Sequence, residues 1–362
     1  MAICPDCGTE FDADNETQPC CGICGFENSG RSSVDDNNAD AWMLVRRDKA
    51  EPDNLWDSEG QDDDYPRDKS YILELSGKHQ IILKKFIGSE EDAVLPGKLL
   101  GRTVTKIGKN AFQNTFSLKR ITLSSTITDI GEWAFSCCSN LSLIIFPEGL
   151  KRIEEKAFLL CANLIRVIIP GSVTAIKHNA FGGCAKLTEI GVADANRVYC
   201  SMDGVLFNKK MTVLIQYPGG RVGHYIVPDT VTGIRSGAFA ACANLKSITI
   251  PESVERIGLG AFNGCTGLSA VMLPEHLSFL WEYAFYSCES LISVIVPAGI
   301  RHVGRGTFAR CPKLNGLYFR GDAPSFDADA FIFSDNITVF YLPGTAGWGS
   351  ICCGRPTALW NI

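Results

Sequence analysis

The chain has 362 residues, of which 46% are hydrophobic and 20% are charged, and its formal net charge is −6. This composition lets most of the chain bury a core and excludes a wholly disordered protein. No apolar run approaches the roughly 18 residues of a membrane-spanning helix. The first residues, MAICPDCGTEFDADNE, lack the basic and apolar regions of a secretory signal.

The charge is distributed unevenly along the chain. Residues 1–70 hold 18 acidic and 6 basic side chains, whereas residues 71–362 hold 22 acidic and 28 basic ones. Proteins that bind nucleic acid usually carry a basic patch on the module that reads it. The small N-terminal module is the acidic part of this chain, so no nucleic-acid partner is expected.

Residues 1–26 contain two CxxCG units, Cys4-Pro-Asp-Cys7-Gly8 and Cys21-Gly-Ile-Cys24-Gly25. Each unit supplies two thiolates from one tight turn, and four thiolates complete the tetrahedral shell of one Zn²⁺. Cys20 is an alternative to Cys21 as the third ligand, although only Cys21 preserves the CxxCG form. A redox pair or disulfides are the alternatives to zinc. Four cysteine ligands leave no open position for water, so the predicted zinc is structural.

This segment resembles the short zinc ribbons that open many bacterial proteins, a resemblance that implies a fold and not a function. Residues 27–70 are rich in acidic residues and poor in apolar ones, and they predict a flexible acidic linker. One apolar cluster at 42–45 is either a short helix or docking motif, or an incidental feature of the linker.

A fixed repeat dominates the rest of the chain. Each step between the repeated phenylalanines is 23 residues, except one step of 58, and a period of this length is typical of a solenoid. The repeated residues are Phe112, Phe135, Phe158, Phe181, Phe239, Phe262, Phe285, Phe308 and Phe331.

Positions around each Phe also recur. Ala usually precedes it, Cys usually follows three residues later and Leu six residues later, and a pair of β-branched or aliphatic residues comes next, often before Pro. The L-x-x-I-x-I pattern predicts a short strand that Pro ends. The A-F-x-x-C segment predicts a short helical turn that closes the coil. Stacked coils would place the phenylalanines in one buried column, which no coil could form alone.

The repeated cysteines have two interpretations. Seven of the sixteen cysteines stand three residues after a repeated Phe. Small apolar side chains in a tight turn favour a packing column, because free cysteine is often buried. Rungs of a sheet lie about 5 Å apart, so disulfides between coils are the alternative.

The 23-residue unit, as in IPESVERIGLGAFNGCTGLSAV, resembles the BspA-like (Treponema pallidum type) leucine-rich repeat. The resemblance covers residues 71–362 and implies a leucine-rich-repeat solenoid with a parallel β-sheet on its concave face and a short helical or irregular convex side. The long step resembles a hairpin insertion, at about 195–225, and the end of the chain resembles a C-terminal cap, at about 335–362. The family implies a binding or adhesion role and supplies no catalytic residues.

In such a solenoid the variable strand positions would face the partner. Two apolar groups occupy these positions, and β-branched residues that merely favour strands are the alternative explanation. The predicted partner-binding residues are Leu143, Ile145, Ile165 and Ile168 in the first group, and Met272, Ile292, Ile295 and Tyr318 in the second.

The sequence lacks the HExxH, phosphate-loop and G-x-S-x-G motifs, which predicts a protein without enzymatic activity. We therefore expect a cytoplasmic scaffold or adaptor that binds a protein partner through the solenoid and carries a structural zinc ribbon. The alternative is an adhesin at the cell surface or secreted by a non-standard route. The cysteines discriminate between them, because zinc thiolates and free thiols fit a reducing compartment and disulfides fit the exterior.

Overall fold

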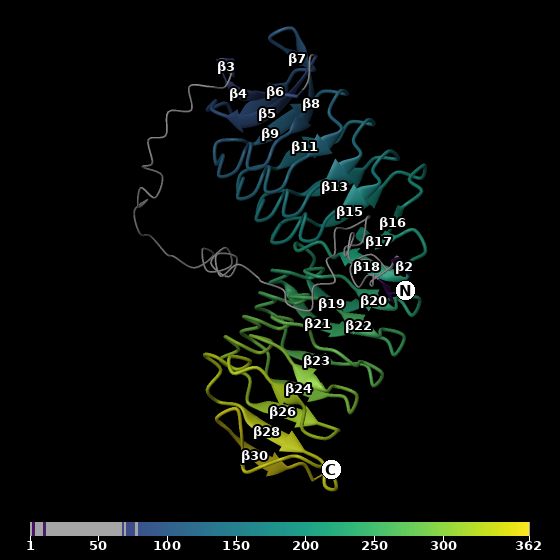
Figure 1. The fold of residues 1–362 in the computed structure, drawn as a ribbon, viewed down its shortest axis with the longest axis vertical. Helices are drawn as coiled ribbons and strands as arrows, with labels where there is room; N and C mark the ends of the chain where they lie inside the picture. Colours follow the sequence, from purple (N-terminus) through teal and green to yellow (C-terminus); the bar gives the residue numbers. More distant parts are fainter. Residues whose placement is uncertain (1, 4–9, 12–66, 69, 77–78, 362) are drawn as a thin grey trace.

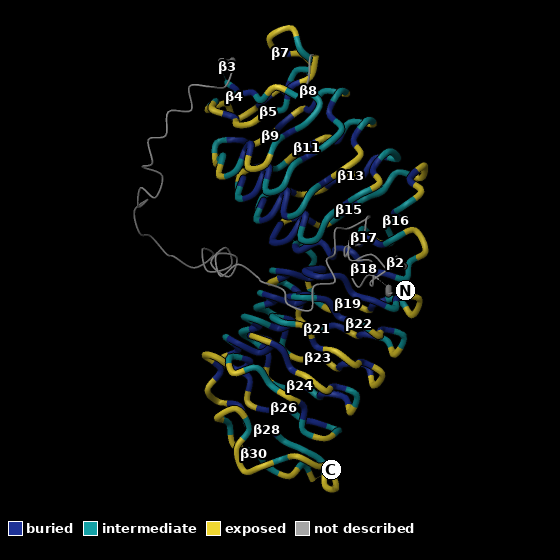
Figure 2. The backbone as a smooth tube through the Cα atoms, in the orientation of Figure 1, coloured by how far each residue is buried: buried dark blue, intermediate teal, exposed yellow. Residues whose placement is uncertain are grey.

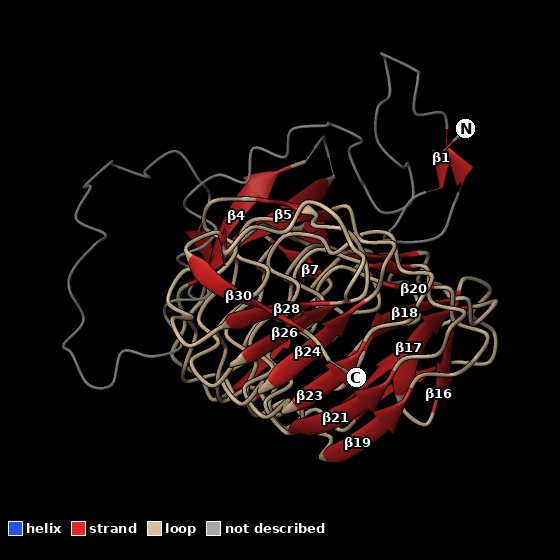
Figure 3. Ribbon diagram, turned by 90° about the horizontal axis from the view of Figure 1, so that it is seen from below, coloured by secondary structure: helices blue, strands red, loops and turns tan. Residues whose placement is uncertain are grey.

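The computed structural model describes residues 2–3, 10–11, 67–68, 70–76 and 79–361. Every regular element in this part is a β-strand, and turns connect the strands (Figure 3). Near the N-terminus β1 (Ala2–Ile3) and β2 (Glu10–Phe11) form an antiparallel pair. The strands after residue 66 build one elongated stack of coils (Figure 1).

The L-x-x-I-x-I segments form what we call the main ladder. Its strands are parallel and in register, so that Ile121 pairs with Ile144 and Val167 pairs with Ile190, each 23 residues apart. One repeat is therefore one coil, as the period predicted. The strands of the main ladder are β6 (Asp92–Leu95), β9 (Arg120–Leu123), β11 (Leu143–Ile145), β13 (Arg166–Ile169), β15 (Glu189–Val192), β19 (Gly223–Ile226), β21 (Leu245–Thr249), β23 (Ala270–Met272), β24 (Ser293–Val296), β26 (Gly316–Phe319), β28 (Thr338–Tyr341) and β30 (Arg355–Leu359).

A second set of short strands, the minor ladder, precedes each turn segment. These strands are also parallel, and single bridges through Leu280 connect β22 to β25. They are β5 (Gln80–Phe86), β8 (Arg102–Ile107), β10 (Asp129–Ile130), β12 (Arg152–Ile153), β14 (Ala175–Ile176), β18 (Val213–Gln216), β20 (Gly233–Ile234), β22 (Arg256–Ile257), β25 (His302–Val303) and β27 (Ser325–Phe326).

Antiparallel strands close the two ends of the stack. At the start, β3 (Arg67–Asp68) pairs with β4 (Tyr71–Leu75), β4 pairs with β5, and β7 (Lys98–Leu99) pairs with β8. Within the range predicted for the cap, β29 (Ile351–Cys352) folds back on β30. β29 covers only the first two residues of β30, Arg355 and Pro356, and Pro356 has no N–H to offer another strand.

The A-F-x-x-C segments are turns without helical geometry, so the predicted short helical turn is wrong and the convex side is of the irregular kind. Residues two before and two after each Phe usually have positive φ, for example Trp133 at 57° and Cys137 at 59°. This left-handed conformation interrupts a right-handed helix. Alternate N–H groups are redirected to the next coil, so Phe135 N donates to the carbonyl of Ala157 at 2.7 Å.

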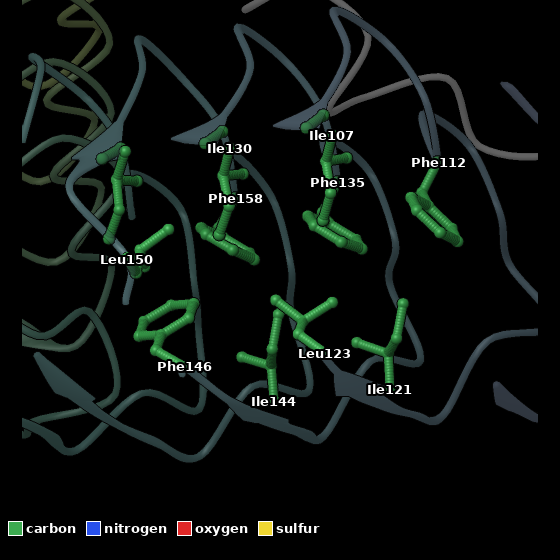
Figure 4. Packing of buried hydrophobic residues seen from close by; sticks show 14 of the residues in the cluster. Ile107, Phe112, Ile121, Leu123, Ile130, Phe135, Ile144, Phe146, Leu150 and Phe158 are labelled. Atoms are coloured by element: carbon green, nitrogen blue, oxygen red, sulfur yellow. The ribbon is translucent and has the colours of Figure 1, made fainter. Parts of the chain in front are cut away.

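The phenylalanines form the predicted buried column. Phe262 is 0% exposed and stacks on Phe239 and Phe285, with ring centroids 4.9 and 5.2 Å apart. Figure 4 shows the first part of the column, with side chains of the main ladder on the opposite wall of each coil. Buried residues line the inside of the whole stack (Figure 2). Phe86 and Tyr217 extend the column, although their surroundings lack the repeat pattern.

The repeated cysteines lie in the core as free thiols. Most donate their S–H to the carbonyl of the previous coil's Phe, as Cys265 Sγ does to Phe239 O at 3.1 Å. Ser334 replaces Cys in the last repeat and makes the same bond to Phe308 O at 2.7 Å. The column is thus a packing column, in agreement with the first interpretation. Each of these thiols adds a second hydrogen bond to a Phe carbonyl that already accepts a backbone N–H, as Phe239 O does from Cys242 N at 3.1 Å.

A hairpin interrupts both ladders within the range 195–225. β16 (Tyr199–Met202), β17 (Val205–Asn208) and β18 are antiparallel, and β15 and β19 belong to separate sheets. On the turn side, by contrast, Gly183 N donates directly to Ala240 O at 3.3 Å. The hairpin separates the coils on the strand side, whereas the turns on the other side stay in direct contact. The stack therefore bends at this point (Figure 1).

Side chains replace the missing strand at this seam. The N–H of Ile176 on β14 donates to Tyr199 Oη at 2.8 Å, and the Ile176 carbonyl accepts from Arg235 Nη1 at 2.7 Å. Arg235 is 1% exposed, and its Nε and Nη2 have no hydrogen-bond partner among the residues that the structure describes. The buried side chains fall into two clusters that meet here, one on each side of the hairpin.

Candidate binding surface

The alternation of side chains along the main ladder creates one continuous outer surface, which we call the strand face. On β11, Ile144 is 3% exposed, whereas its neighbour Ile145 is 62% exposed. Successive strand residues point to opposite faces of a sheet, so each coil presents alternate residues outward. Because neighbouring strands are in register, the outward residues form straight columns across the coils.

The structure places the predicted partner-binding residues on this face. Leu143, Ile145, Ile165, Ile168, Met272 and Ile292 are exposed, whereas Ile295 and Tyr318 are half-buried. Tyr318 stacks on Phe340, with ring centroids 4.7 Å apart, and lies over Gly316, where an added Cβ would come within 2.6 Å of the ring. Tyr318 therefore packs in a half-buried aromatic cluster with Phe340 and Trp360 at the C-terminal end of the strand face.

The sequence divided these residues into two groups, but the register also reveals a longer feature. One column of outward side chains runs along most of the stack, and we call it the apolar stripe. Its members are Val94, Thr122, Ile145 and Ile168 before the hairpin, and Ile226, Thr249, Met272, Ile295 and Tyr318 after it. Val94 and Ile226 were missed because no repeated Phe precedes them at the usual distance.

Charged residues flank the stripe asymmetrically. The strands begin at a predominantly basic edge, with exposed Lys119, Arg120, Arg166, Lys186, Lys246 and Lys313. They end at a predominantly acidic edge, with exposed Glu148, Asp194, Asp229, Glu252, Glu275 and Asp322.

The basic edge is partly neutralised before the hairpin. Lys119 pairs with Glu91 at 2.8 Å, Arg166 pairs with Glu189 at 3.1 Å, and Arg120 pairs with Asp92. The hydrogen bond from Arg120 lowers the pKa of Asp92 below its ordinary value of 3.8. Lys246 and Lys313, after the hairpin, have no ion pair in the described part of the chain.

The other groups with perturbed pKa values belong to the framework of the coils. Glu155 contacts His178 Nε2 at 2.9 Å and Lys156 Nζ at 3.0 Å. Burial disfavours the charged form of Glu155, but these two partners outweigh it, and the pKa falls to about 2. Burial raises the pKa of Cys265 to about 12.

The four predicted zinc ligands, Cys4, Cys7, Cys21 and Cys24, lie outside the described residues. In the sequence the first CxxC unit falls between β1 and β2, the two strands of this segment that the structure describes. Among residues 79–361 no group of three or more His, Cys, Asp or Glu side chains is arranged to hold a metal ion. The described part also has no helix of the length and apolarity needed to span a bilayer.

Comparison with known proteins places these features in a family. The BspA type leucine-rich repeat region matches residues 99–201 and 222–346, in six copies. A leucine-rich repeat protein from Eubacterium ventriosum has the same fold, with a TM-score of 0.62, 21% identity, and coverage of 76% of this chain and 83% of that chain.

Two further solved structures are similar over most of their lengths. The pneumococcal vaccine antigen PcpA is 19% identical over 82% of this chain and 99% of that chain, with a TM-score of 0.49. A Treponema pallidum leucine-rich repeat protein is 21% identical over 81% and 91%, with a TM-score of 0.33. No match was found among curated proteins. The in-register 23-residue coils and the family match together show that this chain belongs to the BspA type leucine-rich repeat family.

Proposed function

We propose that the protein is a non-enzymatic scaffold or adaptor that binds a protein partner through the strand face. The observation that carries this proposal is the apolar stripe, most of whose aliphatic members are exposed on the surface of the solenoid. A contiguous exposed apolar patch on a soluble surface usually marks a contact site. A sheet also holds its side chains rigidly, so little ordering entropy opposes binding.

The zinc ribbon is the proposed second module. Cys4, Cys7, Cys21 and Cys24 would hold one structural Zn²⁺, whose binding energy would fold a segment too short for a core of its own. The β1–β2 pair supports this reading, because it brackets the first CxxC unit as the strands of a zinc knuckle do. Isolated protein should contain one zinc per chain, and Cys4→Ser should remove it.

The cytoplasm is the proposed location. The cysteines of the described part are free thiols, and the buried ones donate hydrogen bonds to the backbone, as expected in a reducing compartment. Alkylation of thiols at the moment of lysis tests this proposal. Free thiols would support a cytoplasmic adaptor, whereas oxidised CxxC units without zinc would support the alternative of an adhesin at the cell surface or outside the cell.

A pair of matched double variants tests the binding face. Ile145→Ser with Ile168→Ser alters the stripe, and Ile87→Ser with Ile332→Ser alters exposed isoleucines elsewhere on the solenoid. Quantitative affinity capture from lysate should lose specific partners with the first pair only. Equal recovery with both pairs would show that the strand face is not the interface.

A further inference from the structure

The part of the strand face after the hairpin differs from the part before it in a way that bears on the shape of the partner. This inference rests on the proposed function. Beside the apolar stripe, from β21 to β26, runs a parallel column of small side chains, Ser247, Ala270, Ser293 and Gly316, which are register partners of one another. The β19 member of this column is the larger His224, whose ring is hydrogen-bonded to Ser247 Oγ at 2.8 Å and to Thr249 Oγ1 at 3.1 Å. The same column before the hairpin holds Asp92, Arg120, Leu143, Arg166 and Glu189, which are larger and mostly ion-paired.

A row of small residues beside a row of large apolar ones lets the backbone of a partner approach closely. From Ile226 to Tyr318 the stripe crosses five strands, from β19 to β26. Rungs of a sheet are about 4.8 Å apart, so this distance is about 19 Å. An α-helix of about 13 residues has the same length.

The rung spacing discriminates between helical and extended partners. One helical turn rises about 5.4 Å, so a helix lying along the stripe drifts from the rungs by about 2.4 Å over four steps. In an extended chain, side chains on the same face recur about every 6.8 Å, so over the same four steps they shift from the rungs by about 8 Å. An extended chain laid alongside the strands would need a free sheet edge. In this region β19 is the edge strand, whereas β21, β23, β24 and β26 are bonded on both sides, so an added strand would contact only the β19 end of the stripe.

The two edges of this region specify the charges of such a helix. Lys246 and Lys313 stand on the basic edge, and Asp229, Glu252 and Asp322 stand on the acidic edge, all of them exposed. A helix complementary to both edges carries acidic residues along one flank of its apolar face and basic residues along the other. Met272, at the centre, has a flexible side chain that adapts to different apolar anchors.

We propose that the region from β19 to β26 binds an amphipathic helix of a partner protein, which lies across the strands along the apolar stripe. Its apolar residues recur at i, i+3 or i+4, and i+7, and contact Ile226, Met272 and Ile295. Its backbone lies over the small residues at Ala270 and Ser293, beyond the His224 ring that is hydrogen-bonded to Ser247. Its acidic flank faces Lys246, and its basic flank faces Glu252.

A peptide selection tests this inference with the full-length chain. The probe is a displayed library of random peptides of about 18 residues, long enough to form about five helical turns. Enriched peptides should show the i, i+3/i+4, i+7 apolar period with acidic and basic flanks. A proline placed in the middle of the best peptide should abolish binding, since it breaks a helix.

Variants of the protein then locate the site by fluorescence anisotropy with the best selected peptide. Met272→Ser with Ile295→Ser, and separately Ala270→Phe, should each weaken binding about tenfold or more, because they remove anchors or fill the row of small residues. Glu252→Lys should weaken binding in low salt and less so in high salt. Ile87→Ser with Ile332→Ser, which alters exposed isoleucines away from the strand face, is the matched control and should leave the affinity unchanged.

Two different failures are distinguishable. Peptides that lose affinity with Met272→Ser and Ile295→Ser but lack the helical period, or tolerate the central proline, would overturn the helix while leaving the strand face as the interface. Peptides whose affinity does not change with any strand-face substitution would overturn the proposed function as well. A selection that enriches nothing over uncoated beads would also contradict the inference.

Discussion

Replacing one ring of the phenylalanine column measures how strongly neighbouring coils hold one another. Phe262 is fully buried between the rings of Phe239 and Phe285, and no solvent reaches the site. Truncation of a buried Phe to Ala typically costs about 3–5 kcal/mol. Two stacked ring pairs, each contributing about 0.5–1.5 kcal/mol, place Phe262→Ala in the upper part of that range.

Urea denaturation followed by circular dichroism provides the assay, with Phe116→Ala as the matched control. Phe116 is 57% exposed, so its truncation should change the free energy of unfolding by less than about 0.5 kcal/mol. The transition of the coils around Phe262 should move to a lower urea concentration with a similar slope. A Phe262→Ala midpoint equal to that of Phe116→Ala would refute the claim that the column couples the coils.

Three further predictions concern pH, thiols and the seam. The pKa of Glu155 is lowered to about 2 from its ordinary 4.5. Its contribution to the free energy of unfolding is therefore present above about pH 4.5 and is lost as the pH falls towards 2. Glu155→Gln should flatten that part of a curve of stability against pH. The buried Cys265 thiol, with its pKa raised to about 12, should resist iodoacetamide at pH 8 in the native protein, whereas the exposed Cys353 should be labelled. Labelled Cys265 peptides in mass spectrometry would show that the thiol column is open to solvent. Arg235→Ala leaves the Ile176 carbonyl without its donor and should lower the free energy of unfolding by about 2–4 kcal/mol. In hydrogen exchange the two buried clusters should then unfold separately. A single shifted transition would contradict the claim that Arg235 holds the two clusters together.

The repeat period carried most of the fold that could be foreseen. A residue such as Ile144 or Phe262 recurs because every coil must present the same side chain to the next coil, so spacing in sequence becomes register in space. The outward position of Ile145 was expected from the resemblance to leucine-rich repeats, and it agrees with the alternation of strand residues. These features depend on local geometry, and each repeat of the sequence provides the same evidence for that geometry.

The features that escaped prediction depend on breaks in the repeat. Positive φ at Trp133 and Cys137 turns a helix-like segment into a ladder of bonds between coils, and no glycine marks either position. From the sequence Arg235 would be taken for an ordinary surface residue. It is buried because no minor-ladder strand pairs with β14 on that side, and its side chain bonds to the Ile176 carbonyl instead. Val94 and Ile226 belong to the apolar stripe because β6 pairs with β9 and β19 pairs with β21. The repeat period does not determine these two pairings.

The central claim is that partners contact the strand face, and site-specific photo-crosslinking in living cells tests it most directly. A photoreactive amino acid at the position of Ile145 or Met272 reports contacts on that face, and one at Ile87 or Ile332 reports contacts elsewhere. We predict covalent adducts of defined mass from the first two positions and none of the same mass from the other two. Adducts formed only at Ile87 or Ile332 would contradict the account.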